Sequence, residues 1–352
     1  MTELLCFGNA IVDVFSSANP DWLEKQGITA PAQHISREKA QQMWEGLNGA
    51  KADITVSSGG AAANVAKIAA MLNVSAAFAG CTGGDDLAAV FEKELRTAGV
   101  VPYLSTGKEK TGVCYAFNCG GKTRGEPEVR IAASPGAALE FTEADVREDL
   151  IADAEAIVLD GYMLDRRPLV QRILQLASRR GIPIALDAAS VFHIREKTEE
   201  ILHYSRNYPL IVFMNADESI VFYDTIRKGG KKTEVTGEEE KETLILRDIC
   251  PVLKYMTEGE IFPIIVIKLG GRGAVVLAGG NIYREETFTI IPRNTVGAGD
   301  AFCAAFLAAW IRGKPIQECA ALGNKVARAI LEVPGTKIKS NKLKSFAKIL
   351  RK

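Results

Sequence analysis

One short stretch of the chain combines a glycine-rich turn, an acid and an apolar helix. It reads Asn294-Thr295-Val296-Gly297-Ala298-Gly299-Asp300 and leads into the apolar residues 301–311. Glycines at alternate positions let successive backbone N–H groups converge on one point, where the following helix adds the positive end of its dipole. Such a turn suits phosphate. Because the Asp300 carboxylate would repel a phosphate, we interpret it as a general base that acts on a second reactant.

The same residues also fit an ordinary helix start. In that interpretation Asp300 is the N-cap, and the glycines only permit a tight entry into the helix. The stretch alone does not separate the two interpretations.

Two earlier stretches place small residues beside a polar side chain that could contact a ligand. Asp13 follows a predicted strand at 4–7 that ends in Gly8-Asn9, and a carboxylate there can accept bonds from two sugar hydroxyls. Gly59-Gly60 opens a small-residue helix and lets a ligand approach the backbone, with Asn64 in the first turn. The alternatives are a turn role for Asp13 and close helix packing through alanines, which requires neither the glycine pair nor the asparagine.

These motifs resemble those of the PfkB (ribokinase-like) carbohydrate kinase family. The C-terminal signature of the family reads Asp-Thr-x-Gly-Ala-Gly-Asp, and Gly59-Gly60 with Asn64 is similar to its N-terminal signature. The start from Gly8 to Asp13 is similar to that of adenosine kinases in particular. The chain departs from the signature at Asn294, where relatives have an aspartate that in some of them helps to hold a monovalent cation. A dependence on potassium is therefore doubtful here.

The resemblance implies a role for each motif, with ATP as phosphate donor. Asp300 would be the base, and the amides of Gly297, Ala298 and Gly299 would receive charge from the γ-phosphate. The acceptor would be held by Asp13, Asn9, Gly59, Gly60, Asn64 and Gln33, the last at a position where adenosine kinases carry a glutamine near the base. Arg124 lines up with an arginine that relatives direct from a lid toward the transferred phosphate, and Arg130 competes for this role.

On the nucleotide side, the resemblance implies ATP with Mg²⁺. Asn215 and Glu218 match the family's Asn-x-x-Glu motif, and Glu218 would order Mg²⁺ through water. As a generic helix start, this pattern is common. The remaining nucleotide contacts would come from Lys268, Gly270, Gly271, Gly273, Thr295 and Asn324.

The hydrophobic pattern from Ala154 onwards alternates between strand and helix. Strands are expected at 156–159, 182–186 and 210–214, with helices at 167–180 and 196–204. This alternation predicts an α/β fold with a doubly wound, mostly parallel sheet flanked by helices. We expect one ribokinase-like domain over 1–352. The resemblance adds a small β lid, built from segments about 11–35 and 100–133.

The amino-acid composition argues against several classes of binding partner. The 352 residues include 43 Lys and Arg and 43 Asp and Glu, so no basic surplus points to nucleic acid or an anionic membrane. The 7 cysteines form no Cys-x-x-Cys pair, and no Gly-x-Gly-x-x-Gly occurs. The apolar run 301–311 is about half of the roughly 20 residues that span a bilayer. We expect a cytoplasmic protein, monomeric or homodimeric, that acts on a small molecule.

The acceptor stays open between a sugar and a ribonucleoside. The order of the motifs favours the adenosine-kinase-like branch, whereas residues 268–274 look more like the sugar-kinase form of the nucleotide strand. Phe15, Ile35, Phe117 and Tyr162 could form an apolar slot for a nucleoside base, and packing within the lid or the sheet is the equal alternative for them. We place the primary hydroxyl of a sugar first and a nucleoside such as adenosine second. A catalytically silent sugar-binding regulator is a third possibility, against which the intact Asp300 argues.

Overall fold

A computed structural model describes residues 2–49, 53–120, 129–227, 233, 235–258, 262–288, 290, 297–332 and 340–351. Its large sheet contains β1 (Leu4–Phe7), β5 (Ala76–Thr82), β6 (Val101–Thr106), β9 (Ala156–Asp160), β10 (Ile184–Asp187), β11 (Leu210–Asn215), β12 (Ile264–Lys268), β13 (Ala274–Ala278) and β14 (Asn281–Glu285). The order across this sheet is β14-β13-β12-β11-β10-β9-β1-β5-β6. Neighbours from β6 to β12 pair in parallel, while β13 and β14 are antiparallel.

The central strands of this sheet are buried on both faces. All side chains of β1, β5 and β9 are inaccessible, as expected for parallel strands covered by helices on both sides. Successive residues enter different cores: Leu4 and Cys6 join one, whereas Leu5 and Phe7 join the other. The predicted doubly wound, mostly parallel α/β fold is therefore confirmed.

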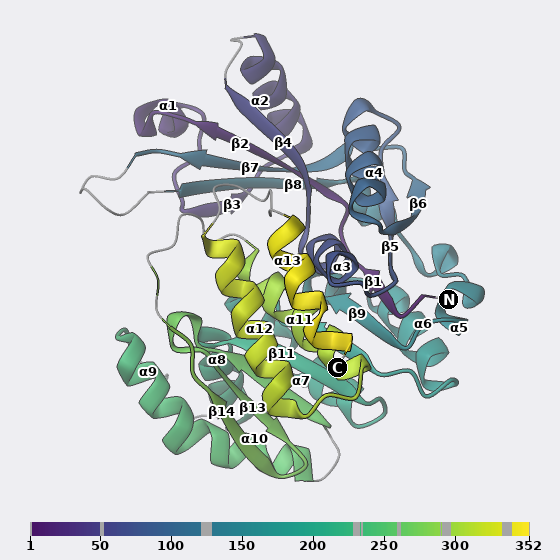
Figure 1. Cartoon of the computed structure of the whole chain (residues 1–352). Helices are drawn as coiled ribbons and strands as arrows, with labels where there is room; N and C mark the ends of the chain where they lie inside the picture. Colours follow the sequence, from purple (N-terminus) through teal and green to yellow (C-terminus); the bar gives the residue numbers. More distant parts are fainter. Residues whose placement is uncertain are drawn as a thin grey trace.

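Helices form both outer layers. One face carries α3 (Ala61–Met71), α11 (Ala298–Ile311), α12 (Ile316–Leu331) and α13 (Ser340–Ala347), which lie side by side in Figure 1. The opposite core includes residues of α5 (Glu148–Ala152), α6 (Arg167–Ser178), α7 (Val191–Ser205), α8 (Ala216–Ile226) and α10 (Cys250–Glu258). Helix α11 is buried along residues 301–309, and a Cβ at Gly323 of α12 would lie 2.8 Å from the Phe302 ring. That glycine lets α12 pack closely on α11.

A second sheet forms the upper part of Figure 1. It contains β2 (Ile11–Ser17), β3 (Ala32–His34), β4 (Ile54–Gly59), β7 (Thr111–Asn118) and β8 (Val129–Gly136), in the order β3-β8-β7-β2-β4. Helices α1 (Pro20–Lys25) and α2 (Arg37–Gly49) accompany it. Two details differ from the lid expected at 11–35 and 100–133, because β4 joins this sheet and β6 does not. Helix α4 (Asp86–Ala98) instead returns the chain so that β6 pairs in parallel with β5.

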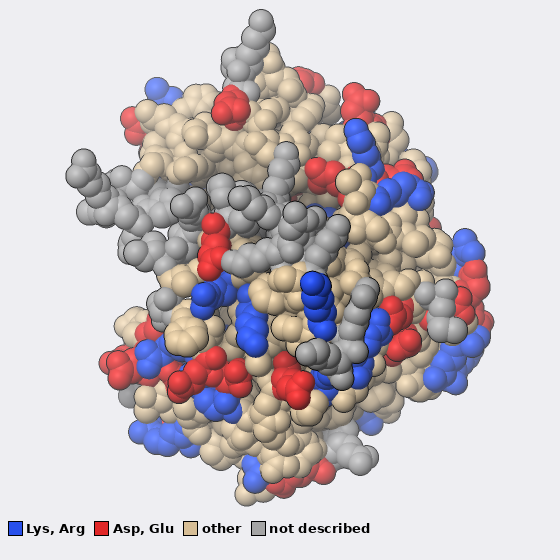
Figure 2. All heavy atoms as spheres, viewed as in Figure 1, with Lys and Arg blue, Asp and Glu red and all other residues tan. Residues whose placement is uncertain are grey.

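Helix α9 (Glu238–Leu244) begins with an acidic first turn. Figure 2 shows basic and acidic side chains interspersed on the face that carries α12 and α13, in keeping with the balanced composition. Within the described ranges, no helix combines the length and apolarity that a membrane span requires.

Candidate active site

The two signature motifs meet in space at Asp300. Its Oδ2 accepts a hydrogen bond of 2.8 Å from Nδ2 of Asn64, which lies 236 positions earlier in the sequence. The N-cap of α11 is Gly297, in the left-handed region with φ of +81°, and Asp300 lies in the first turn. The interpretation of Asp300 as the helix N-cap is therefore wrong. Burial raises the pKa of Asp300 to about 6, while the bond from Asn64 opposes this shift.

A partly buried cation, Lys268, lies beside the same helix start. Lys268 Nζ donates to Asp187 Oδ2 at 2.8 Å, and a Cβ at Gly299 would lie 3.3 Å from that nitrogen. Burial opposes the charge on Lys268, but Asp187 and then Glu218 raise its pKa above the ordinary value. A protonated amine thus adds to the positive end of α11, where the amides of Gly297, Ala298 and Gly299 stand.

Asp13 lies on β2 and is 8% exposed. A Cβ at Gly59 would approach its Oδ2 to 2.2 Å, and a Cβ at Gly60, where φ is +84°, would approach the carbonyl oxygen of Asn9 to 2.5 Å. Both glycines are needed because the backbone runs so close to these groups. Burial raises the pKa of Asp13 to about 7; Lys67 opposes this shift, and Asp300 and Glu94 add to it.

The side chain of Asn9 is engaged by an arginine. Its Oδ1 accepts from Nη2 of Arg166 at 2.6 Å, and Nη1 of Arg166 donates to the carbonyl of Ala138 at 2.6 Å. This bond ties the end of β1 to the chain that follows β9. A direct contact between Asn9 and the acceptor stays a prediction.

Gln33 closes a loop of the small sheet. Its Nε2 donates to the carbonyl of Gly27 at 2.8 Å, and its Oε1 accepts from the amides of Thr29 and Ala30, each at 3.1 Å. The amide thus serves the loop between α1 and β3. A contact from Gln33 to a base stays a prediction.

Asn215 and Glu218 form a capping box at the start of α8. Asn215 Oδ1 accepts from the amide of Glu218 at 2.8 Å, and Glu218 Oε2 accepts from the amide of Asn215 at 2.7 Å. Burial raises the pKa of Glu218, although Lys268 opposes the shift. The motif has a structural role as a cap, and its role toward Mg²⁺ stays a prediction.

The other nucleotide-side residues gather near the end of β14. Asn324 donates to the carbonyl of Glu285 at 3.2 Å, and a Cβ at Gly273 would lie 2.1 Å from the same oxygen. Gly270 and Gly271 form the short helix η5 (Gly270–Arg272) between β12 and β13. The sequence order alone did not show that Asn324 and Gly273 share this carbonyl.

Three predicted positions, Arg124, Asn294 and Thr295, lie outside the described residues. The competing Arg130 is bound within the small sheet, because its Nη1 donates to the carbonyl of Ile28 at 3.0 Å and its Nη2 lies 3.5 Å from Glu24.

Sequence reasoning assigned no role to four charged residues close to this site. Asp160 and Asp187 end β9 and β10, and Lys67 and Glu94 lie on α3 and α4. An acid at the end of a buried parallel strand is a recognisable signal, because such strand ends share one edge of the sheet. Lys67 carried a weaker signal: it follows Asn64 by three positions and so lies on the same helix face.

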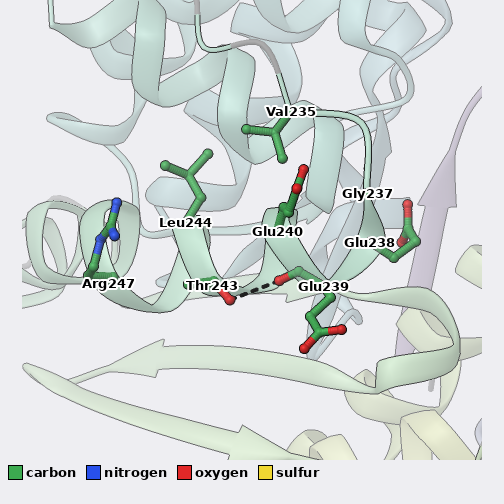
Figure 3. A pocket seen from close by; sticks show the side chains of 8 residues that line it. All are labelled: Val235, Gly237, Glu238, Glu239, Glu240, Thr243, Leu244 and Arg247. Atoms are coloured by element: carbon green, nitrogen blue, oxygen red, sulfur yellow. Dashed lines mark hydrogen bonds between the residues drawn. The ribbon is translucent and has the colours of Figure 1, made fainter.

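A hollow beside α9 is unsuited to phosphate. Figure 3 shows its lining, which consists of Val235, Gly237, Glu238, Glu239, Glu240, Thr243, Leu244 and Arg247. Three consecutive glutamates would repel an anion there. The nucleotide is better matched by the start of α11.

Comparison with known proteins finds kinases that are similar to this chain over most of its length. The chain is 23% identical to an adenosine kinase of Schizophyllum commune, over 96% of this chain and 97% of that protein. It is 26% identical to a 2-dehydro-3-deoxygalactonokinase of Haloferax volcanii, over 76% and 80%. The solved adenosine kinase from Sinorhizobium meliloti superposes with a TM-score of 0.79 at 24% identity and covers 99% of both chains.

The predicted resemblance, including its adenosine-kinase-like character, is confirmed by these relatives. Residues 27–343 match the family described as pfkB family carbohydrate kinase. The chain therefore belongs to the pfkB carbohydrate kinases, a family of phosphotransferases.

Proposed function

We propose that this chain transfers the γ-phosphate of ATP to the primary hydroxyl of a sugar, in the cytoplasm and as a monomer or homodimer. The hydrogen bond between Asn64 and Asp300 carries the proposal. It joins α3, which opens with the glycines beside Asp13, to the N-terminus of α11, which suits phosphate. The Asp300 carboxylate thus lies between the residues proposed to bind the acceptor and the helix start proposed to bind the phosphate.

Asp300 removes the proton from the acceptor hydroxyl. The hydroxyl oxygen forms a bond to the γ-phosphorus, the bond from that phosphorus to the bridging oxygen breaks, and ADP leaves. A pKa of about 6 keeps Asp300 ionised at neutral pH and close to the range in which a base transfers protons efficiently. Asn64 fixes one oxygen of the carboxylate and so sets its orientation.

Positive groups held in place by the fold stabilise the phosphoryl group that is transferred. The amides at 297–299 and the ammonium of Lys268 are in place before the reaction, so they stabilise developing negative charge without reorganisation. Asp187 holds that ammonium at 2.8 Å. Lys268 therefore acts on the phosphate side, as its assignment to nucleotide binding requires.

The residues present fit a metal held mainly by phosphates and water. Glu218 is buried and has one oxygen fixed by a backbone amide, which suits an ordered contact to Mg²⁺ through water. When bound, Mg²⁺ neutralises charge on the phosphates. We include no monovalent cation, because Asn294 stands where the family signature has an aspartate.

The packing of side chains in and around the small sheet favours a sugar acceptor over a nucleoside. The Phe117 ring stacks on Tyr115 at 6.0 Å and meets Trp22 at 6.2 Å, and Ile35 packs against the core. Together with Gln33, which closes its own loop, these residues serve the lid's packing. The Asp13 carboxylate, held against Gly59, is the group best suited to accept bonds from sugar hydroxyls.

A ribonucleoside is the second candidate. The similarity to adenosine kinases extends over nearly the whole length of both chains, whereas that to the sugar kinase covers a smaller share. Phe15, two positions after Asp13 on β2, points to the same face and is half-buried, so it is available to contact a base.

A panel of acceptors tests the proposal. The purified chain with ATP and Mg²⁺ is assayed for ADP release with ribose, fructose, 2-keto-3-deoxy sugar acids, adenosine and inosine, with Asp300→Asn as control. Phosphorus NMR of the product shows coupling to two protons for a primary phosphate ester. A kcat/KM for adenosine above that for every sugar selects the second candidate, and acceptor binding without ADP release selects the silent regulator.

A further inference from the structure

A partly buried chain of hydrogen bonds through Lys67, Ser58 and Glu94 lies next to Gly59, on the acceptor side of the site. Lys67 Nζ donates to the carbonyl of Ser58 at 2.5 Å and to its Oγ at 2.9 Å. The amide and hydroxyl of Ser58 in turn donate to Glu94 Oε2 at 2.6 and 3.0 Å. Ser58 is fully buried and directly precedes Gly59, which packs against Asp13. The link therefore joins α4, β4 and α3.

Three carboxylates from three elements face Lys67: Asp13 on β2, Glu94 on α4 and Asp300 on α11. Burial lowers the pKa of Lys67, and these acids oppose the shift. In return, Lys67 lowers the pKa of Asp13 and of Asp300, both of which burial raises. Asp300 also faces Asp187 and Lys268.

We propose that Lys67 is a positioning residue that favours the ionised forms of Asp13 and Asp300 and keeps the two carboxylates aligned, and that Glu94 holds Lys67 in place through Ser58. Two like charges in a buried site need a compensating cation, which the neutral amide of Asn64 does not supply. The ammonium binds Ser58, so it acts on the reaction through the carboxylates. The inference rests on the proposed function, because it assigns Asp13 to the acceptor and Asp300 to the proton.

Two substitutions that remove charges of opposite sign, one at Lys67 and one at Glu94, distinguish this positioning role from simple packing. Removal of the Lys67 cation takes away the group that favours both carboxylates in their ionised form. Glu94→Gln keeps a side-chain oxygen that can accept from Ser58, so Lys67 stays in place, but it removes an anion that disfavours ionised Asp13. A purely structural link predicts that both changes disturb the site in the same direction, whereas the positioning role predicts opposite shifts.

The experiment compares Lys67→Met, Lys67→Arg and Glu94→Gln, with Lys93→Met on the exposed face of α4 as control. The readouts are the pH profile of kcat/KM and the titration of ¹³C-labelled aspartate carboxyls by NMR. Lys67→Met should raise the pKa of the acidic limb of the kcat/KM profile by about one unit. The pKa values of Asp13 and Asp300 in the NMR titration should rise by about the same amount. For Asp300 alone, the loss at pH 6 is then about fivefold, against almost none at pH 8.5. Lys67→Arg should restore the profile, Glu94→Gln should move it to lower pH, and Lys93→Met should match the unaltered chain.

An unchanged profile in Lys67→Met, or an upward shift in Glu94→Gln, overturns the proposal. If Lys67→Met does not fold, the direction of the Glu94→Gln shift decides. The NMR titration needs no turnover. If no acceptor is phosphorylated, the proposed function fails, while the carboxyl titrations still test Lys67.

Discussion

Lys268 and Asp187 form an ion pair of 2.8 Å between the ends of β12 and β10, and the ammonium also lies against Gly299 at the start of α11. The two strands are separated by β11 in the sheet, whose own end carries Asn215 and the cap of α8. The ion pair thus bridges across β11, the strand that ends in Asn215, the first residue of the Asn-x-x-Glu motif. It places one positive charge where the phosphate side of the site needs it.

Lys268→Met should raise the KM for ATP more than that for the acceptor, because it removes charge from the phosphate side only. It should also destabilise the fold by up to about 3 kcal/mol, since Asp187 is left buried without its partner. Urea unfolding measures this cost. In the double variant with Asp187→Asn, stability should recover while the KM for ATP stays high. Recovery of both would show that Lys268 has only a structural role.

Asp300→Asn should lower kcat by roughly 10²–10⁴, the usual contribution of a general base, and leave ATP binding nearly unchanged. Asparagine keeps the shape of the side chain and the contact with Asn64 but accepts no proton. Turnover and the affinity for an ATP analogue are measured on the same preparation. Near-normal turnover would exclude Asp300 as the base.

Gly59→Ala should raise the KM for the acceptor strongly and that for ATP little. The added methyl would lie 2.2 Å from Asp13 Oδ2, so the carboxylate has to move. Gly46→Ala on α2 is the matched control, because a Cβ there meets no heavy atom of the described chain within 4 Å. Equal effects on both substrates would place Asp13 outside the acceptor site.

The sequence predicted the parts of this molecule that depend on local pattern. Alternation of buried strands and amphipathic helices predicted the parallel sheet, and the resemblance of two motifs to a known family implied that Asn64 and Asp300 belong to one site. Helix α7 starts five residues earlier than expected, at Val191, because Ser190 Oγ accepts from the amide of His193 and caps the helix. The position of such a helix start depends on a single capping side chain.

Long-range pairing explains what the sequence did not predict. The assignment of β6 to the large sheet depends on its partner β5, and that of β4 to the small sheet depends on β2. Likewise, the grouping of Lys67 with Glu94 arises because both bind Ser58 from different helices. No period or motif in the chain encodes such contacts.

The contribution of Asp160 to the free energy of unfolding should fall as the pH rises from about 4 to about 7. Asp160 is 2% exposed at the end of β9, and burial raises its pKa to about 7, with a backbone bond from Tyr162 opposing the shift. Because the folded state holds the proton more tightly than the unfolded one, the contribution of this group is fully present below the unfolded pKa of about 4. It is lost as the pH rises through the folded pKa. Asp13 adds to the effect in the same window.

Asp160→Asn removes this titration and keeps an oxygen that can accept from the amide of Tyr162, which lies 3.1 Å from Oδ1. The variant should be more stable than the unaltered chain at pH 8, by about 2–4 kcal/mol, and closely similar at pH 4. Urea unfolding at both values measures the difference. Asp149→Asn, at an exposed position, is the control and should show no such gain at pH 8. A gain that is equal at both pH values would mean that the stability change comes from packing, because a charge buried at Asp160 acts only when the carboxyl is ionised.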